Sequence, residues 1–106
     1  MPAAPSEQSH FVYRLIPPRP TFATDMNDSE AATMQEHVAY WSARMDEGRV
    51  LVFGPVNGPE GFWGIGIVVA DSEDAARALA DADPAITSDL ATYAIEPMPS
   101  VIVPSV

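Results

Sequence analysis

One short run, HFVYRLI at residues 10–16, constrains the fold more than any other part of the chain. Its aromatic and β-branched residues favour a β-strand, and the PPRP segment at residues 17–20 must end that strand. Alternation along the strand places large apolar side chains on both faces: Phe11, Tyr13 and Leu15 on one, Val12 and Ile16 on the other. The sheet that contains this strand therefore needs cover on both sides.

The segments that follow alternate between helix and strand patterns. The first expected helix is capped by Asp28 or Ser29 and ends at Gly48, and a second helix is capped by Asp71 or Ser72. Strands are expected at residues 49–55, 62–70 and 90–97, with an irregular or single-turn stretch after Pro84. The turn-rich NGPEG segment at residues 57–61 predicts that the two middle strands form a hairpin. The order β-α-β-β-α-β predicts a ferredoxin-like α+β sandwich, in which an antiparallel sheet carries both helices on one face. A homodimer that stacks sheet on sheet would cover the other face.

The first helix carries an apolar stripe. Four large apolar side chains recur along it at spacings of four, three and four residues: Met34, Val38, Trp41 and Met45. At about 100° per residue they lie within about 60° of one another, so the spacing predicts that they face the core. His37 lies about 60° from Met34 and about 40° from Trp41 on the helical wheel, so its imidazole borders this core.

The length of 106 residues allows one compact domain with a modest core. We expect a disordered N-terminal tail at residues 1–9, a folded domain at residues 10–97, and an extended C-terminal arm at residues 98–106, where prolines interrupt an apolar stretch. No apolar run approaches the roughly 20 residues that a membrane span needs, and the first residues lack the pattern of a signal peptide. We therefore expect a cytoplasmic protein that has no membrane partner.

The charge and the residue types exclude several classes of function. Fifteen acidic residues against five arginines give a formal charge of −10, which opposes binding to nucleic acids and anionic lipids. The chain contains no cysteine, so thiol nucleophiles and thiolate metal sites are absent. Its two histidines, His10 and His37, match no metal-ligand spacing. We expect no metal, no cofactor and no nucleic-acid partner.

The expected topology brings His37 and Asp83 to one end of the molecule. The first helix begins at the end of the sheet where the first strand finishes, and the second helix ends where the last strand begins. His37 lies about eight residues, or about 12 Å, into its helix, and Asp83 follows the second helix. An aspartate bound to one ring nitrogen selects the tautomer and raises the basicity of the other nitrogen, as a general acid/base requires. The alternative is a structural histidine bound to a loop carbonyl, with Asp83 simply ending a helix.

Other positions each have two interpretations. Arg14, at the middle of a central strand, must either pair with a carboxylate or bind an anionic ligand. Gly64 and Gly66 leave one sheet face without side chains, either for the close approach of a helix or partner strand or as the floor of a small pocket. Tyr40 and Trp41 either pack in the core or an interface, or contact a ligand.

Four stretches together resemble the YciI-like, or YCII-related, family of small proteins: EHVAYW at residues 36–41, EGRVLVFGP at 47–55, DSEDAARAL at 71–79 and DADP at 81–84. The resemblance implies a ferredoxin-like α+β fold, dimerisation through the sheet as a dimeric α+β barrel, and a His–Asp centre at His37 and Asp83. The sequence departs from the family in having Ala85 where a phenylalanine is usual. Its IPPRPTFATDM loop, at residues 16–26, is also longer than the usual connection to the first helix.

Two hypotheses of function follow. A related dehydrochlorinase and muconolactone isomerases of similar architecture imply proton-transfer chemistry on small, often ring-derived anions. In the first hypothesis the protein is a cofactor-independent lyase or isomerase in which His37 moves a proton and Asp83 orients it. Arg14, with Tyr40 or Trp41, would hold an anionic or aromatic small molecule. In the second hypothesis the protein is a non-catalytic dimeric module that binds a metabolite or another protein, and its C-terminal arm exchanges between subunits.

Overall fold

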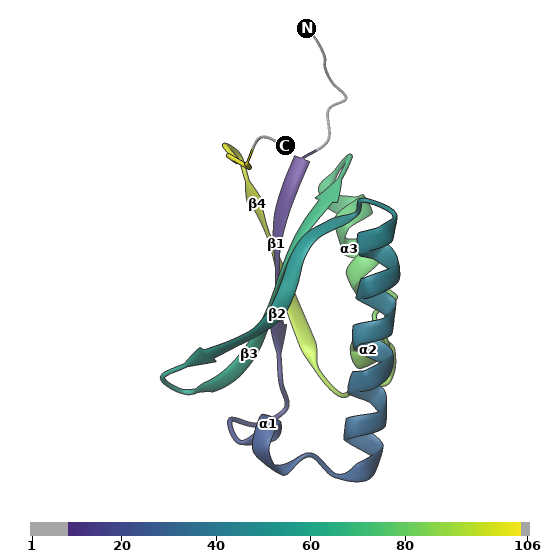
Figure 1. Cartoon of the computed structure of the whole chain (residues 1–106), viewed down its shortest axis with the longest axis vertical. Coiled ribbons are helices and arrows are strands. Elements are labelled where there is room, and N and C mark those ends of the chain that lie inside the picture. The colour runs from purple at the N-terminus through teal and green to yellow at the C-terminus, as the bar shows by residue number, and fades with distance from the viewer. Residues whose placement is uncertain (1–8, 105–106) are drawn as a thin grey trace, which may run out of the picture.

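The computed structural model describes residues 9–104 as a four-stranded antiparallel sheet with its helices on one face (Figure 1). Its elements in chain order are β1 (Ser9–Ile16), α1 (Phe22–Asp25), α2 (Asp28–Asp46), β2 (Val50–Gly58), β3 (Gly61–Ala70), α3 (Glu73–Asp81), α4 (Pro84–Thr87) and β4 (Thr92–Met98). The strand order is β2-β3-β1-β4, so β1 is central and β2 pairs with β3 as a hairpin. The predicted α+β class is confirmed, and the topology is compatible with the ferredoxin-like plan.

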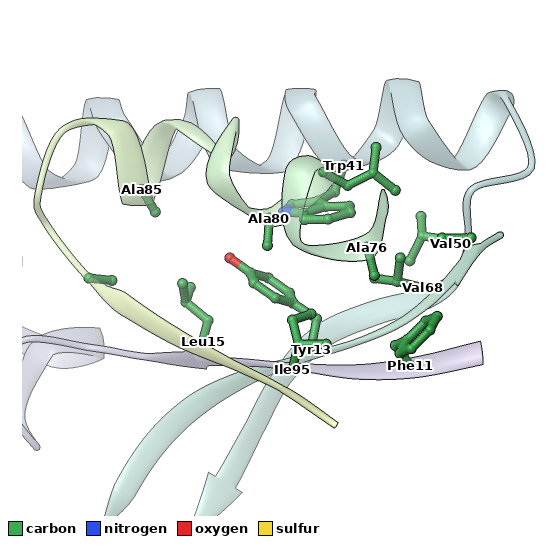
Figure 2. Packing of buried hydrophobic residues seen from close by; sticks show 13 residues of the cluster. Phe11, Tyr13, Leu15, Trp41, Val50, Val68, Ala76, Ala80, Ala85 and Ile95 are labelled. Atoms are coloured by element: carbon green, nitrogen blue, oxygen red, sulfur yellow. The ribbon is translucent and has the colours of Figure 1, made fainter. Parts of the chain in front are cut away.

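The core lies between the sheet and the helices (Figure 2). Strand β1 turns three side chains toward the helices, as its alternation predicted: Phe11, Tyr13 and Leu15. Ala76 and Ala80 of α3 and Ala85 of α4 are fully buried, and their small side chains let both helices approach the sheet closely. Trp41 of α2 fills the space beside Tyr13, with the two ring centroids 5.0 Å apart.

Helix α2 is rotated relative to the predicted apolar stripe. Trp41 is only 1% exposed, but Val38 is 50% and Met45 39% exposed, so the prediction that these two side chains face the core was wrong. The packed face carries His37 and Tyr40 instead, because both make hydrogen bonds to groups on the neighbouring helical segments. Polar contacts, which the apolar spacing does not reveal, therefore set the rotation of this helix.

The sheet face opposite the helices carries no element among residues 9–104 (Figure 1). Val12 is half-buried there, while Ile16 and Val52 are 43% and 55% exposed. Most of the predicted N-terminal tail, residues 1–8, and the last two residues of the predicted arm lie outside the described residues, whereas residues 99–104 contain no helix or strand. No helix in the described part of the chain is long and apolar enough to cross a membrane.

The segment between β1 and α2 contains a short helix, α1, that the sequence patterns did not reveal. Phe22 of α1 is buried, and the Arg19 guanidinium donates hydrogen bonds to the carboxylates of Asp25 and Glu30. Asn27 caps α2: its side chain accepts from the Glu30 backbone at 2.8 Å, and the Glu30 carboxylate accepts from the Asn27 backbone at 3.0 Å. Hydrogen bonds from Arg19 and Asn27 lower the pKa of Glu30 to about 2. Arg19 thus ties α1 to the start of α2.

The turn of the β2–β3 hairpin packs against the end of the proline segment. Gly61 has a φ of 118°, a conformation that residues with a Cβ rarely adopt. A Cβ at this position would also overlap the backbone carbonyl of Pro20. The hairpin turn and the segment that leads into α1 therefore support each other.

We expect Gly61→Ala to lower the free energy of unfolding by about 1–3 kcal/mol, because the added methyl group meets both an unfavourable φ and the Pro20 carbonyl. Gly54→Ala on the same hairpin is the matched control, since a Cβ there meets no atom within 4 Å. Urea unfolding followed by tryptophan fluorescence measures both. Equal free energies for the two variants would contradict a supporting role for this contact.

Candidate functional site

A fully buried carboxylate, Asp83, lies at the centre of the site. Asp83 is 0% exposed and caps the one-turn helix α4, where its Oδ1 accepts a hydrogen bond from the Ala85 backbone at 2.8 Å. Pro84 takes the first position of that helix, where its missing N–H is not needed. The local sequence Asp-Pro thus both begins α4 and turns the carboxylate inward.

Three side chains from other elements donate to this carboxylate. The Tyr13 hydroxyl from β1 lies 2.6 Å from Oδ2, and the Trp41 Nε1 from α2 lies 2.8 Å from the same oxygen. His37 of α2 presents Nδ1 at 2.9 Å from Oδ1 and 2.8 Å from Oδ2. Burial alone raises the pKa of Asp83, but hydrogen bonds from His37, Tyr13 and Trp41 outweigh it and hold the pKa below its usual value. Asp83 is therefore ionised at neutral pH.

Tyr13 is the member of the site that sequence reasoning assigned only to the core. Figure 2 shows its ring rising from β1 toward the helices. Burial and the adjacent Asp83 charge raise the pKa of Tyr13 well above its ordinary value, so the hydroxyl stays protonated and donates. The sequence does contain one indication of this role: a tyrosine that faces inward on a central strand has a buried phenolic hydroxyl, which needs a hydrogen-bond partner.

The ionised Asp83 determines the state of His37. A carboxylate can only accept, so Nδ1 of His37 must carry a proton. When the imidazole is neutral, Nε2 on the far side of the ring therefore holds the lone pair. The His37 side chain is 12% exposed and lines a cavity, so it stands between the buried charge and a space that a ligand can enter.

That cavity has a volume of about 370 Å³ and lies between α1, α2 and the β2–β3 hairpin. Its walls are largely aromatic and aliphatic, with Phe22, Phe53 and Phe62 coming from three different elements. Among the described residues no Asp, Glu or Arg lines it. Because Tyr13 and Trp41 turn their polar atoms to Asp83, His37 supplies the ionisable group of the wall.

Gly64 forms part of the same cavity wall. A Cβ at Gly64 would lie 3.1 Å from the Cβ of Leu15, so the glycine also makes room for that neighbouring side chain. Gly66 packs beside Phe53 and Tyr13 and does not line the cavity. Gly64 therefore lines the cavity, as one interpretation predicted, whereas the nearest neighbours of both glycines are side chains of adjacent strands and not an approaching helix.

The structure does not bring Arg14 to the site. Arg14 lies on the sheet face opposite the helices, is exposed, and stacks its guanidinium 3.9 Å from the ring centroid of Trp63. The expectation that this arginine is buried was wrong, because no described element covers that face of the sheet, and the cation has an aromatic ring as its partner in place of the expected carboxylate. Binding of an anionic ligand by Arg14 stays a prediction. An anion bound by Arg14 would be separated from His37 by the sheet.

Tyr40 and Trp41 also have structural partners. The Tyr40 hydroxyl donates to the backbone carbonyl of Leu79 at 2.7 Å and so connects α2 to α3 outside the cavity wall. Trp41 does line the cavity, but its N–H is directed at Asp83. In residues 9–104 no three His, Asp or Glu side chains gather in a group that could hold a metal ion.

We expect the ionised Asp83 to stabilise the fold above a pH of about 4, its ordinary pKa, and to lose this effect as pH falls through its lower folded-state pKa. Asp83→Asn should lower the free energy of unfolding by about 3 kcal/mol at neutral pH, because an amide cannot accept from all of the donors. The difference from wild type should shrink in acid. Urea unfolding at a series of pH values measures it, with the exposed Glu36→Gln as control. A difference that stayed constant with pH would show that the charge is not what the donors stabilise.

Comparison with known proteins agrees with the resemblance seen in the sequence. None of the curated proteins compared with the chain matches it. The sequence profile of the YCII-related domain, however, matches residues 11–99. The matched region includes Tyr13, His37, Trp41 and Asp83, and it covers most of the chain. This protein therefore belongs to the YCII-related domain family.

Proposed function

We propose that the protein is a cofactor-independent acid/base catalyst of the lyase or isomerase type, in which His37 moves a proton and Asp83 orients it. The observation that carries this proposal is the position of His37. One ring nitrogen is bound to a buried, ionised carboxylate, and the ring lines an apolar cavity. A histidine that served packing alone would not need a buried, ionised carboxylate beside it, because burying that charge is costly.

In the proposed reaction the Nε2 lone pair of His37 takes a proton from a carbon or hydroxyl group of the substrate. The electron pair of the broken bond enters the substrate, and Asp83 stabilises the imidazolium that forms. In an isomerisation His37 returns the proton to a different atom of the same molecule. In an elimination the electron pair expels a leaving group on the neighbouring atom, and His37 gives the proton to that group or to water.

Tyr13 and Trp41 act in this scheme as positioning residues. Both donate to Oδ2 of Asp83, which fixes the carboxylate before any ligand arrives. A carboxylate fixed in this way holds the imidazole ring in one orientation and one tautomer, so little rearrangement is needed during proton transfer. Trp41 would contact the substrate through its ring, which lines the cavity, and not through its N–H group.

The proposal includes a homodimer, formed by the sheet faces opposite the helices as a dimeric α+β barrel. Its support is the set of apolar side chains on that face, where Ile16 and Val52 are exposed and Val12 is half-buried, beside the exposed Arg14 stacked on Trp63. A twofold axis would bring the same patch from each copy together. Sedimentation equilibrium of the full chain tests this, and a monomer at micromolar concentrations would contradict it.

We expect the wild-type protein to exchange hydrogen for deuterium in D2O in at least one member of a panel of cyclic ketones, lactones and hydroxylated aromatics. His37→Gln should reduce the rate about 100-fold or more, because glutamine can still donate to Asp83 but cannot accept a proton at neutral pH. His10→Gln should leave the rate unchanged. Proton NMR of the substrates measures exchange.

A ligand-free measurement accompanies this experiment. ¹⁵N NMR of neutral His37 should show the proton on Nδ1 in the wild type, and Asp83→Asn should release this preference. His10 provides an internal reference. Exchange in no member of the panel, together with a fixed tautomer, would favour the non-catalytic binding module; exchange that survives His37→Gln would contradict the proposed base.

A further inference from the structure

We infer that the cavity beside His37 binds an uncharged, mainly apolar molecule built on one or two flat rings, and not an anion. The inference rests on the proposed function, because it takes His37 as the group that meets the substrate. It also replaces the anionic ligand that Arg14 had suggested, since Arg14 lies on the other face of the sheet.

The shape of the cavity supports a ring-sized apolar ligand. A volume of about 370 Å³ is near the lower end of the range for ligand pockets, roughly 300–1,000 Å³. Three large apolar side chains that line it are also solvent-exposed, Met26 by 36%, Val38 by 50% and Phe62 by 37%. They come from three separate segments, so exposed apolar surface gathers around one hollow instead of being scattered. The outward rotation of α2 that exposed Val38 is what places it there.

The charges around the cavity oppose an anion. No cationic side chain lines the cavity in the described part of the chain. Arg19, which packs near Phe22 of the wall, is already bound to the carboxylates of Asp25 and Glu30. While His37 is the neutral base, it and Asp83 together carry one negative charge. An anionic ligand would therefore lose its hydration against apolar walls, gain no cation, and be repelled by Asp83 and by a chain of net charge −10.

The few polar groups in the cavity wall indicate that only a small part of the ligand is polar. Tyr13 and Trp41 direct their donors at Asp83, so His37 Nε2 is the acceptor that this wall offers. One acceptor matches one hydroxyl or one acidic C–H group at one end of the ligand. The rest of the molecule faces the rings of Phe22, Phe53 and Phe62, which favour a flat apolar partner.

Acetophenone and benzoate test this inference, because they share a phenyl ring and are similar in size but differ in charge. Binding of each to the full-length wild-type protein at neutral pH is measured by titration in NMR, with the His37 ring resonances as the local probe and His10 as reference. We expect acetophenone to shift the His37 resonances and to bind at least about tenfold more tightly than benzoate.

Substitution at the cavity mouth provides a second measurement. Val38→Arg places a cation beside the cavity at a half-exposed helix position, and it should raise the affinity for benzoate relative to that for acetophenone by about tenfold or more. Val38→Gln is the matched control and should preserve the wild-type preference. Circular dichroism confirms that both variants are folded. Benzoate binding as tightly as acetophenone to the wild type, or no effect of either compound on His37, would overturn the inference.

The two proposals fail in different ways. Preferential binding of acetophenone without deuterium exchange in any compound would overturn the catalytic proposal and support the ligand class. Exchange of an anionic compound that depends on His37 would support the catalytic proposal and overturn the ligand class. Binding is measured without turnover, so the ligand class is tested whether or not the protein is an enzyme.

Discussion

The Asp83 carboxylate is a buried charge, and most of the arrangement of this domain serves to satisfy it. A charge with 0% exposure is tolerated only when donors replace the water that it has lost. Here the donors come from β1, α2 and the backbone of α4. The central strand, the long helix and the segment before β4 must therefore all be in place before the carboxylate is satisfied, and the core and the candidate site form together.

The same requirement explains how α2 lies on the sheet. Hydrophobic spacing alone would turn Val38 and Met45 inward, at the expense of His37 and Tyr40. The observed rotation leaves two apolar side chains in solvent but gives the polar atoms of α2 their partners on α3 and beside α4. An unsatisfied buried carboxylate costs more than two half-exposed aliphatic side chains, so the polar contacts prevail.

Much of the fold could be predicted from local patterns, because the alternation in β1, the prolines after Ile16 and the cap at Ser72 act over a few residues. The pairing of His37 with Asp83 followed from topology and family resemblance, and the structure brings the two side chains into contact. Two features depended on contacts distant in sequence and were missed: the Tyr13 hydroxyl needed an acceptor 70 residues away, and Arg14 found an aromatic partner across a strand pair. A third, α1, was missed although Arg19 holds it through carboxylates 6 and 11 residues away. Residue type alone does not show which partner each group will meet.

The cavity is bounded by two kinds of structure that differ in how readily they accept amino-acid substitutions. On the side of Asp83, the alanines of α3 and α4 are buried and the rings of Tyr13 and Trp41 pack against each other, so a larger side chain there requires matching changes in its neighbours. On the opposite side, α1 and the β2–β3 hairpin are surface segments whose side chains reach solvent. Mutation can therefore alter which molecule fits the cavity without disturbing the groups that would act on it. A scaffold divided in this way is suited to diversification, because new ligand preferences can arise at the cavity mouth while the buried hydrogen-bond network of Asp83 is inherited unchanged.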